Sequence, residues 1–579
     1  MRTTFALMAR CGLAAIVFVV AGWMLQWPPP GAGASFGVTF AVNSTADSHD
    51  AHPGNGKCAD RAGRCTLRAA VEAADAEPSG TSVTIAVPAG TYRLTLGSLG
   101  LTANTVSITG TGSGAIAGAG SGTTVIKANG AFRVVNVGSA ASATLSMVTV
   151  TGGNAGNSGY GGGIYNAGHL TVSASVVSSN TAAAGGGIAN AGGTLTVTHT
   201  TVTGNTDTGY GGAGIQNGGL QNVGGLVTVT DSTVSDNSGG GDGGGILNGQ
   251  NGHPASAHSA AVGVRPGCPL LRRCVAGPGR PPAGRPPTAK LRLVVTGTQL
   301  TGNTSGNAGG AIANDGGVAT VTGSTLTGNS AGGGIGGGIL AFGSLTVKAS
   351  TISSNKGSYG GGIEAYDGHV AVPSVTTIER STISGNRAVV GGGIDISTTV
   401  SVSASTLTAN RAGQGAGIEV EGATVNVLNS TIAGNVGKGA GIETYACGGG
   451  TVGYTTISGN SPDLSLSCPD LRLTGTIVAG TASGTNCVGA SPSELTGYNL
   501  DSGTSCGFSE KTDLTKKDPR LGKLADNGGP TMTQTLRHGS PAINHGGTSA
   551  NGCPPADQRG LSRPFGPACD IGAVEVHHT

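Results

Sequence analysis

Short runs of alternating apolar and polar residues recur along most of the chain, and many of them close on Asn. STISSN ends at Asn355, STISGN at Asn386 and STIAGN at Asn435. Between these runs lie Gly-rich blocks that end in Ile, at Ile164, Ile188, Ile215, Ile246, Ile312, Ile339, Ile363, Ile394, Ile418 and Ile442. Most successive Ile positions are about 24 to 31 residues apart, so the pattern is an internal repeat.

Each repeat holds about three short β-runs separated by Gly or Asn. One unit cannot bury its apolar side alone, whereas stacked units bury each Ile or Val against its counterpart in the next layer. Asn suits the corners and can form hydrogen-bonded ladders between layers. We therefore predict an all-β fold, a right-handed parallel β-helix (solenoid) over residues 81–510, with room for about 16 coils at ~4.8 Å per layer.

One interval between Gly-rich blocks is much longer than the others and contains residues 252–290. This stretch has eight Pro, five Arg and no Asp or Glu. Its composition predicts a disordered loop extruded between two coils. A frameshifted stretch of the gene would leave the same pattern, and a binding segment is the third interpretation.

Composition narrows the possible partners. Charged residues make up 10% of the chain, aromatic residues 3%, and the formal net charge is +2. A charge this small gives no electrostatic case for nucleic acid or for an anionic membrane surface, and we expect no nucleic-acid partner. Abundant Gly, Thr, Ser and Val suit a thin core made of many small layers.

The N-terminus has the pattern of a secretory signal peptide, residues 1–34. Arg2 and Arg10 precede an uncharged, mainly apolar run, Cys11–Leu25, and Ala32-Gly33-Ala34 forms a small-residue cleavage site. An uncleaved N-terminal anchor is the alternative. Because no second apolar run of that length follows, we expect no transmembrane span after cleavage and a secreted or cell-surface location.

The ten cysteines after the signal peptide fall into neighbouring pairs, as disulfides in an exported chain do. The pairs are Cys58 with Cys65, Cys268 with Cys274, Cys447 with Cys468, Cys487 with Cys506 and Cys553 with Cys569. Sequence does not fix connectivity, so pairing by proximity is an expectation. The C-x-x-C spacing typical of zinc sites does not occur.

A short amphipathic helix is predicted at the start of the repeat region. TLRAAVEAADA, residues 66–76, places Leu67, Ala70, Val71 and Ala74 on one face, with Thr66 as N-cap. The surrounding stretch, residues 40–76, resembles the CSLREA domain of exported bacterial β-helix proteins, although this chain reads CTLRAA where the family has a Glu. The resemblance implies an N-terminal cap over residues 35–80.

Two further resemblances concern the repeats and the C-terminus. The repeat blocks resemble polymorphic outer-membrane protein repeats and, more broadly, the pectin-lyase-like β-helix superfamily. DPRLGKLADNGGPTMTQTLRHGSPAINHG (residues 518–546), DQRG (557–560) and CDIGAVE (569–575) are similar to the choice-of-anchor Q domain, which implies a small C-terminal domain over residues 511–579. None of these resemblances implies a defined reaction.

The motifs of the known enzymes of this fold are mostly missing. Asn205-Thr206-Asp207 spells the NTD of polygalacturonases, but Asn205 is the repeat's own Asn, and no DD, GHG or RIK occurs. The chain also has no nine-residue calcium repeat. We therefore assign no catalytic residue from a family motif.

One constellation stands out in the last four copies of the repeat. The residue after the Gly-turn Ile is there acidic, and strand alternation predicts that it faces outward. The acids are Glu364, Asp395, Glu419 and Glu443, and on the same face two residues later lie Tyr366, Ser397, Glu421 and Tyr445. Lys356, Arg387 and Arg411 each follow the coil Asn directly, and Lys438 is near the corresponding place. Stacked coils would turn the acids into a column.

Three interpretations of this acid column remain open. It is a solvated structural ladder balanced by the basic residues. Alternatively it binds a cation, which would be calcium, through Glu364, Asp395, Glu419 and Glu443, or a polysaccharide, with Glu421, Tyr366 and Tyr445 as further contacts. In the third interpretation, the acid column lines a catalytic groove. Glu419 and Glu443 would act there as the carboxylate pair of a glycosidase, or Arg387 or Arg411 would act as the base of a lyase.

The sequence as a whole favours an exported β-helix protein that binds carbohydrate or mediates adhesion through a long repetitive face. Its partner would be an extracellular polysaccharide or a host or neighbour-cell surface. A polysaccharide lyase or glycoside hydrolase is the alternative, and a rigid surface spacer without a ligand is the third hypothesis.

Overall fold

The computed structural model describes residues 37–111, 123–209, 211–218, 224–249, 291–366, 374–445, 449–467, 469–480 and 485–577. Residues Gly37–Thr579 form one compact unit. The predicted signal peptide and the 252–290 insert, with the predicted pair of Cys268 and Cys274, lie outside the described residues.

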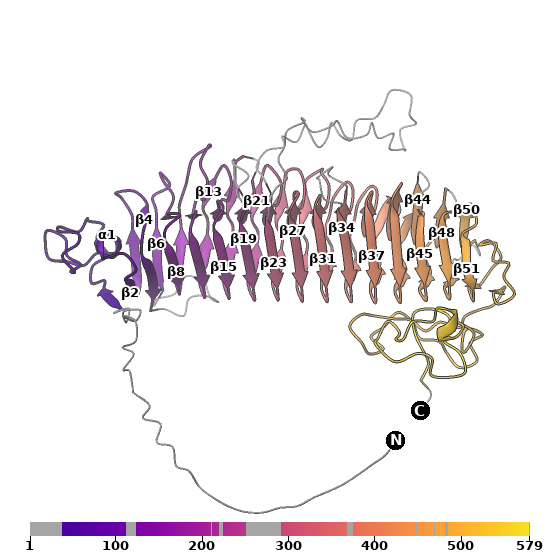
Figure 1. The fold of residues 1–579 in the computed structure, drawn as a ribbon. Coiled ribbons are helices and arrows are strands. Elements are labelled where there is room, and N and C mark those ends of the chain that lie inside the picture. Colours follow the sequence, from indigo (N-terminus) through magenta and orange to yellow (C-terminus); the bar gives the residue numbers. More distant parts are fainter. Residues whose placement is uncertain are drawn as a thin grey trace, which may run out of the picture. The chain divides into compact units, whose positions relative to one another are not determined.

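Three long parallel sheets build the described part of the chain (Figure 1). Sheet 1 has 16 strands and runs from β1 (Val38–Ala41) and β2 (Ser82–Val87) to β51 (Ser493–Gly497). Sheet 2 has 14 strands, from β4 (Leu99–Leu101) to β50 (Cys487–Gly489). Sheet 3 has 16 strands, from β3 (Gly90–Arg93) to β53 (Leu514–Thr515). From β2 to β52 consecutive strands belong to different sheets, so each circuit of the chain is one coil of a parallel β-helix, as predicted.

A single coil shows how the repeat maps onto these sheets. Strand β30 (Ile339–Ala341) lies in sheet 2, β31 (Ser344–Lys348) in sheet 1 and β32 (Thr351–Ser353) in sheet 3. Ile339 pairs in register with Ile363 of the next coil, and Ile352 pairs with Ile383. Every Gly-turn Ile from Ile164 to Ile442 is fully buried, so a continuous stack of apolar side chains forms the core.

A ladder of buried Asn side chains runs along one corner of the coils and confirms the expected role of the coil Asn. Up to Asn435, each Nδ2 donates to the Oδ1 of the Asn in the next coil, for example Asn303 to Asn329 and Asn329 to Asn355, both at 3.0 Å. The rungs are Asn180, Asn205, Asn237, Asn303, Asn329, Asn355, Asn386, Asn410, Asn435 and Asn460. The ladder satisfies backbone and side-chain groups that would otherwise be buried without partners.

A second Asn ladder was not anticipated from the sequence. It joins Asn166, Asn190, Asn217, Asn248 and Asn314, with Nδ2–Oδ1 distances of 2.7 to 2.9 Å. Each of these residues comes two positions after a Gly-turn Ile, and this regular spacing was the signal in the sequence.

The N-terminal end is covered by helix α1 (Leu67–Ala76), close to its predicted range. Thr66 is the N-cap, as predicted, and its side chain accepts a hydrogen bond from Ala69 N at 3.1 Å. Arg68 is buried and bridges Asp47 at 2.7 Å while donating to Gly97 O at 2.6 Å. Helix α1 is thereby held to the loop that precedes β4.

Residues beyond β53 form loops and one short 3₁₀ helix, η1 (Ser549–Asn551), and pack against the outer side of sheet 3. Gln558 is fully buried there, where its Nε2 donates to Thr406 Oγ1 at 3.0 Å and its Oε1 accepts from Thr431 Oγ1 at 2.7 Å. Thr406 belongs to β38 (Thr406–Thr408) and Thr431 to β42 (Thr431–Ala433). A side chain of the DQRG stretch therefore joins the C-terminal loops to two coils.

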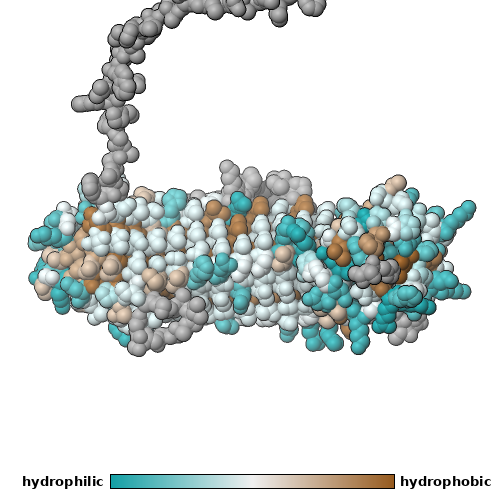
Figure 2. Space-filling model, turned by 90° about the horizontal axis from the view of Figure 1, so that it is seen from below, coloured by the Kyte–Doolittle hydropathy of each residue, from teal (hydrophilic) through white to brown (hydrophobic). Residues whose placement is uncertain are grey.

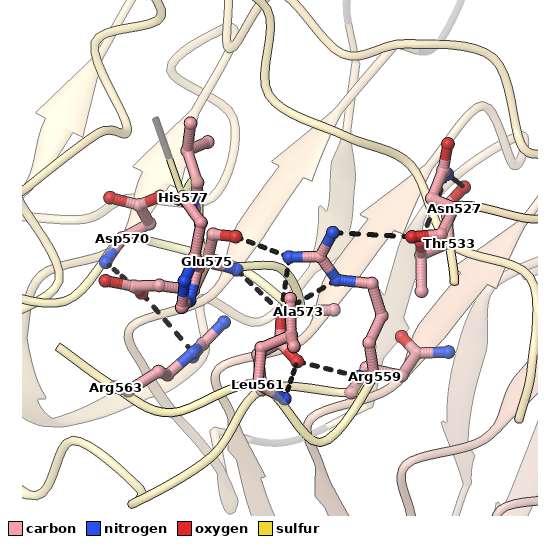
Figure 3. A network of polar contacts seen from close by, with 12 residues as sticks. Asn527, Thr533, Arg559, Leu561, Arg563, Asp570, Ala573, Glu575 and His577 are labelled. Carbon is pink, nitrogen blue, oxygen red and sulfur yellow. Dashed lines mark hydrogen bonds and ion pairs between the residues drawn. The ribbon is translucent and has the colours of Figure 1, made fainter. Parts of the chain in front are cut away.

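Figure 3 shows the polar network that organises these loops. Asp557 accepts hydrogen bonds from Arg559 at 2.8 Å and from Glu575 N at 3.0 Å. Arg563 is buried beside Glu575, with an Nε–Oε2 distance of 3.5 Å. The two C-terminal motifs, DQRG and CDIGAVE, thus meet in one network although they are separated in sequence.

Three of the predicted disulfides are present: Cys58–Cys65, Cys487–Cys506 and Cys553–Cys569. The first closes the loop before α1, and the second lies near the last coil. Within the described residues, no helix has the length and apolar character to cross a bilayer.

The predicted disulfide between Cys447 and Cys468 is not confirmed. Both Cys447 and Cys468 lie outside the described residues, and the three disulfides of the described chain do not include them. This pairing therefore stays a prediction that rests on proximity in the sequence.

Candidate functional site

The four acids of the predicted column do stack on successive strands of sheet 2. Glu364 of β33 (Ile363–Ala365) pairs with Asp395 of β36 (Ile394–Ile396), and Asp395 pairs with Glu419 of β40 (Ile418–Glu421). Glu419 pairs in turn with Glu443 of β44 (Ile442–Tyr445). The expected register between neighbouring coils is confirmed.

The expectation that these acids face solvent is wrong. Glu364 and Asp395 are each 1% exposed, and Glu419 is 6% exposed. The cause is the Gly-rich turn, which folds back over the outer face of sheet 2. Gly391 has φ 61° and Gly415 has φ 52°, and a Cβ at either position would collide with the acid four residues later. Alternation placed the side chains on the correct face of the strand but could not show that the turn covers it.

The same covered space is a small apolar core in earlier coils. Leu247, Ala313 and Leu340 occupy the positions equivalent to the acids and pack with Ala308 and Ile335. In the fold, this position is therefore an interior one, whichever residue fills it.

Glu443 is the least buried of the four acids. Its Oε2 accepts a hydrogen bond from Gly415 N of the preceding coil at 2.8 Å, and Ser465 Oγ lies 3.5 Å from its Oε1. Burial raises the pKa of Glu443, while the Gly415 N–H and the charge of Lys438 act in the opposite direction. The contacts of Glu443 join two neighbouring coils.

The two aromatic candidates are half-buried. Tyr366 packs edge-on against Phe342, with 5.7 Å between ring centroids. Tyr445 pairs in register with Glu421, which is also half-buried. Tyr366 therefore takes part in packing between neighbouring coils.

The basic residues behave differently from the acids, because they lie on the surface. Lys356, Arg387 and Arg411 are exposed and paired in register, one per coil. We call these three residues the basic stripe. Lys438 is not part of the basic stripe. Strands β39 (Arg411–Gln414) and β43 (Val436–Lys438) pair with an irregularity in register, so that Lys438 lies beside Gln414 and not beside Arg411. Among the described residues, none of the basic stripe forms an ion pair with a carboxylate, whereas the charge of Lys438 does act on Glu443 of the acid column.

The basic stripe continues a longer column of hydroxyl side chains. A fourth, small sheet contains β13 (Thr181–Ala182), β17 (Thr206–Asp207), β21 (Ser238–Gly239), β25 (Thr304–Ser305) and β29 (Ser330–Ala331), of which β13 and β21 are labelled in Figure 1. The first residue of each strand points outward, and Ser330 is bridged to Lys356. The outward column is Thr181, Thr206, Ser238, Thr304, Ser330, Lys356, Arg387 and Arg411.

Sequence reasoning identified the three cations of this column but not its hydroxyl part. The signal was available, since each member is the residue directly after a ladder Asn. Much of the coil surface seen in Figure 2 is of intermediate hydropathy, which fits its content of Thr, Ser and Gly. Against that background, three stacked cations form a local concentration of charge.

Two buried aspartates lie elsewhere under the Gly turns. Burial raises the pKa of Asp207 to about 7, although the Gly209 N–H bonded to Oδ1 at 2.9 Å opposes the rise. Burial also raises the pKa of Asp242 to about 7, and the charges of Asp315 and Asp207 add to the effect. The NTD motif at Asp207 therefore contributes an interior carboxyl.

These raised pKa values predict a pH dependence of stability. An unfolded Asp has a pKa near 3.9, so the folded chain holds protons at Asp207 and Asp242 that the unfolded chain releases between about pH 4 and 7. The free energy of unfolding should therefore fall as pH rises, by at least about 2 kcal/mol between about pH 5 and 7.5. Denaturant unfolding of the purified protein at both pH values measures this change in the free energy of unfolding. The Asp207→Asn/Asp242→Asn variant should show a flatter profile, and a stability that rises over this range would contradict the assignment.

Within the described ranges, no group of three or more His, Cys, Asp or Glu side chains is placed to share a metal ion. Glu364, Asp395, Glu419 and Glu443, proposed as calcium ligands from the sequence, thus do not form such a group.

Comparisons with known proteins give no family assignment. No family profile matches the sequence, and no curated protein matches it. Among solved structures, the chain is similar to the A-module of the Azotobacter vinelandii mannuronan C-5 epimerase AlgE4, with 13% identity, 74% of this chain and 92% of that chain covered, and a TM-score of 0.29. It is also similar to the pectate lyase Pel9A, with 14% identity, 93% and 96% coverage, and a TM-score of 0.21. The description of the fold rests on the strand pairing of this chain itself.

Proposed function

We propose that this protein is an exported carbohydrate-binding protein that holds an acidic polysaccharide along its outward column. The observation that carries the proposal is the basic stripe, Lys356, Arg387 and Arg411, exposed and stacked one per coil. Exposed cations without a carboxylate partner in the described chain are available to an external anion.

Periodicity is the second argument. Neighbouring strands are about 4.8 Å apart, so the three cations repeat at that interval along the axis of the coils. An acidic polysaccharide is a linear array of anionic groups, and its chain can place successive groups along such an axis. The contacts add because they are made by one ligand molecule.

The hydroxyl part of the column extends the surface that a glycan would contact. Thr206, Ser238 and Thr304 are exposed and carry groups that both donate and accept hydrogen bonds. A ligand that begins on the basic stripe could continue over them. We infer that the charged end supplies most of the affinity and the hydroxyl residues supply additional contacts.

Export is the second part of the proposal. The three disulfides support an oxidising compartment outside the cytosol, in keeping with the N-terminal signal pattern. A long, rigid, glycan-binding solenoid outside the cell would serve adhesion to a polysaccharide matrix or to another cell.

The experiment compares polygalacturonate with a neutral glucan of similar length, both offered to the purified full chain. We expect saturable binding of the acidic polymer that weakens as salt rises, and no binding of the neutral one. Equal binding of both polymers would exclude an electrostatic site, and binding of neither would favour a spacer. Release of unsaturated or reducing sugar ends during the incubation would instead identify the lyase or hydrolase of the alternative hypothesis.

A further inference from the structure

Exposed apolar side chains lie among the cations of the basic stripe. Val389 is 62% exposed, which makes it the most exposed large hydrophobic side chain of the described residues, and it follows Arg387 by two positions. Val436 is 50% exposed and pairs in register with Arg411. Two of the three cations of the basic stripe therefore have an exposed valine beside them.

The apolar surface extends from Val389 toward the Gly turns. Val390 is half-buried, and an isolated bridge pairs it with Tyr359 of the preceding coil, which is half-buried as well. Val389 N also donates to Ser358 O of that coil at 2.9 Å, so the two segments run side by side. We call Tyr359, Val389, Val390 and Val436 the apolar patch.

Bare backbone lies beside this patch at Gly413. Gly413 is exposed, and its N–H donates to Val389 O of the preceding coil at 2.8 Å. Only backbone atoms of Val389 lie within 4 Å of a Cβ built at Gly413. No side chain of the described residues therefore fills the space over Gly413, and a ligand can approach the backbone closely there, two residues from Arg411.

Cations, apolar side chains and bare backbone together match the groups of a sugar acid. A pyranose ring presents C–H groups on its faces and hydroxyl or carboxylate groups around its edge. The carboxylates of such a ligand would meet the basic stripe in charge-assisted contacts. A ring face that packs on the apolar patch removes apolar surface from water, which is favourable. Binding sites commonly combine an apolar surface with a few polar groups in this way.

We infer that the apolar patch packs against the ring faces of the bound polysaccharide and makes the site selective for a polymer of sugar acids over polyanions without rings. The inference rests on the proposed function, because it concerns the same ligand on the same surface. The basic stripe by itself attracts any chain of closely spaced carboxylates. Val389 and Val436 supply the contacts that charge does not, and they are specificity-determining residues of the site.

The test compares polygalacturonate with poly-L-glutamate of matched length, a carboxylate polymer without rings, by equilibrium binding to the purified full chain. We expect tighter binding of polygalacturonate. Val389→Ser/Val436→Ser should weaken polygalacturonate binding at least about tenfold, because two apolar contacts are lost. The same change should alter poly-L-glutamate binding less than about twofold, because the charges are untouched.

The matched control makes the same substitutions on sheet 1. Val318 of β27 (Val318–Thr322) is 50% exposed, and Val375 of β34 (Val375–Glu379) is 43% exposed. Val318→Ser/Val375→Ser should leave the affinity for both polymers within about twofold, because these valines lie away from the basic stripe.

The possible outcomes separate this inference from the proposed function. If polygalacturonate binds through Arg387 and Arg411 but the Val389→Ser/Val436→Ser variant binds it as tightly as the original chain, the proposed function stands and the inference is wrong. Equal losses for both polymers would show that the valines only hold the cations in place, which also overturns it. If the original chain binds no polygalacturonate, both proposals fail.

Discussion

The double charge reversal Arg387→Glu/Arg411→Glu is expected to lower the affinity for an acidic polysaccharide by at least about 100-fold. Each charge-assisted contact to an anionic group contributes about 1.5–3 kcal/mol, and the substituted residues would also repel the ligand. The fold should tolerate the change, because both side chains are exposed and neither forms an ion pair among the described residues. Equilibrium binding of polygalacturonate to both proteins measures the loss.

The control for this experiment changes net charge equally on other faces. Arg93 lies on β3 in sheet 3, Arg292 lies on β23 (Arg292–Thr296) in sheet 1, and both are exposed. Arg93→Glu/Arg292→Glu should leave affinity within about threefold if only long-range charge is altered. Equal losses in the two double variants would mean that overall charge, and not the basic stripe, controls binding.

Asn329→Ala is expected to cost at least about 3 kcal/mol of stability, the largest effect we expect from a single interior substitution. The change removes the acceptor for Asn303 N and Nδ2, both at 3.0 Å, and the donor to Leu300 O at 2.9 Å. Asn355 Oδ1 loses one of its two donors and keeps the backbone N–H of residue 329. All these groups are buried, and each unsatisfied group carries a desolvation penalty.

Denaturant unfolding followed by circular dichroism measures this effect, with amide hydrogen exchange to locate it. Because each coil contacts only its neighbours, exchange should accelerate most in the coils beside residue 329. Gln299→Ala, on the exposed face of β24 (Gln299–Thr301), is the control and should change stability by less than about 0.5 kcal/mol. A loss below about 1 kcal/mol for Asn329→Ala would show that the ladder is not a major source of stability.

Much of the solenoid could be predicted because its repeat acts locally. The Gly-turn Ile positions predicted a stacked core, the coil Asn predicted a ladder, and Thr66 predicted the start of the cap helix. Each of these inferences needs only the spacing of residues within one or two repeats, since neighbouring coils are equivalent in space.

The prediction that was wrong and the contacts that were not predicted both depend on tertiary geometry. The exposure of Asp395 was predicted from strand alternation, but the backbone of Gly391 turns the preceding segment over it. Gln558 contacts Thr431, which is 127 residues away in the sequence, and no local sequence pattern predicts that contact.

The central claim is that an acidic glycan lies along the axis of the coils on the basic stripe. Affinity for oligogalacturonates of defined length, from dimer to octamer, tests it most directly. We predict that affinity rises steeply until the ligand spans Lys356 to Arg411 and changes little with further length. Affinity that is independent of length, or unaffected by the Arg387→Glu/Arg411→Glu change at every length, would contradict the account.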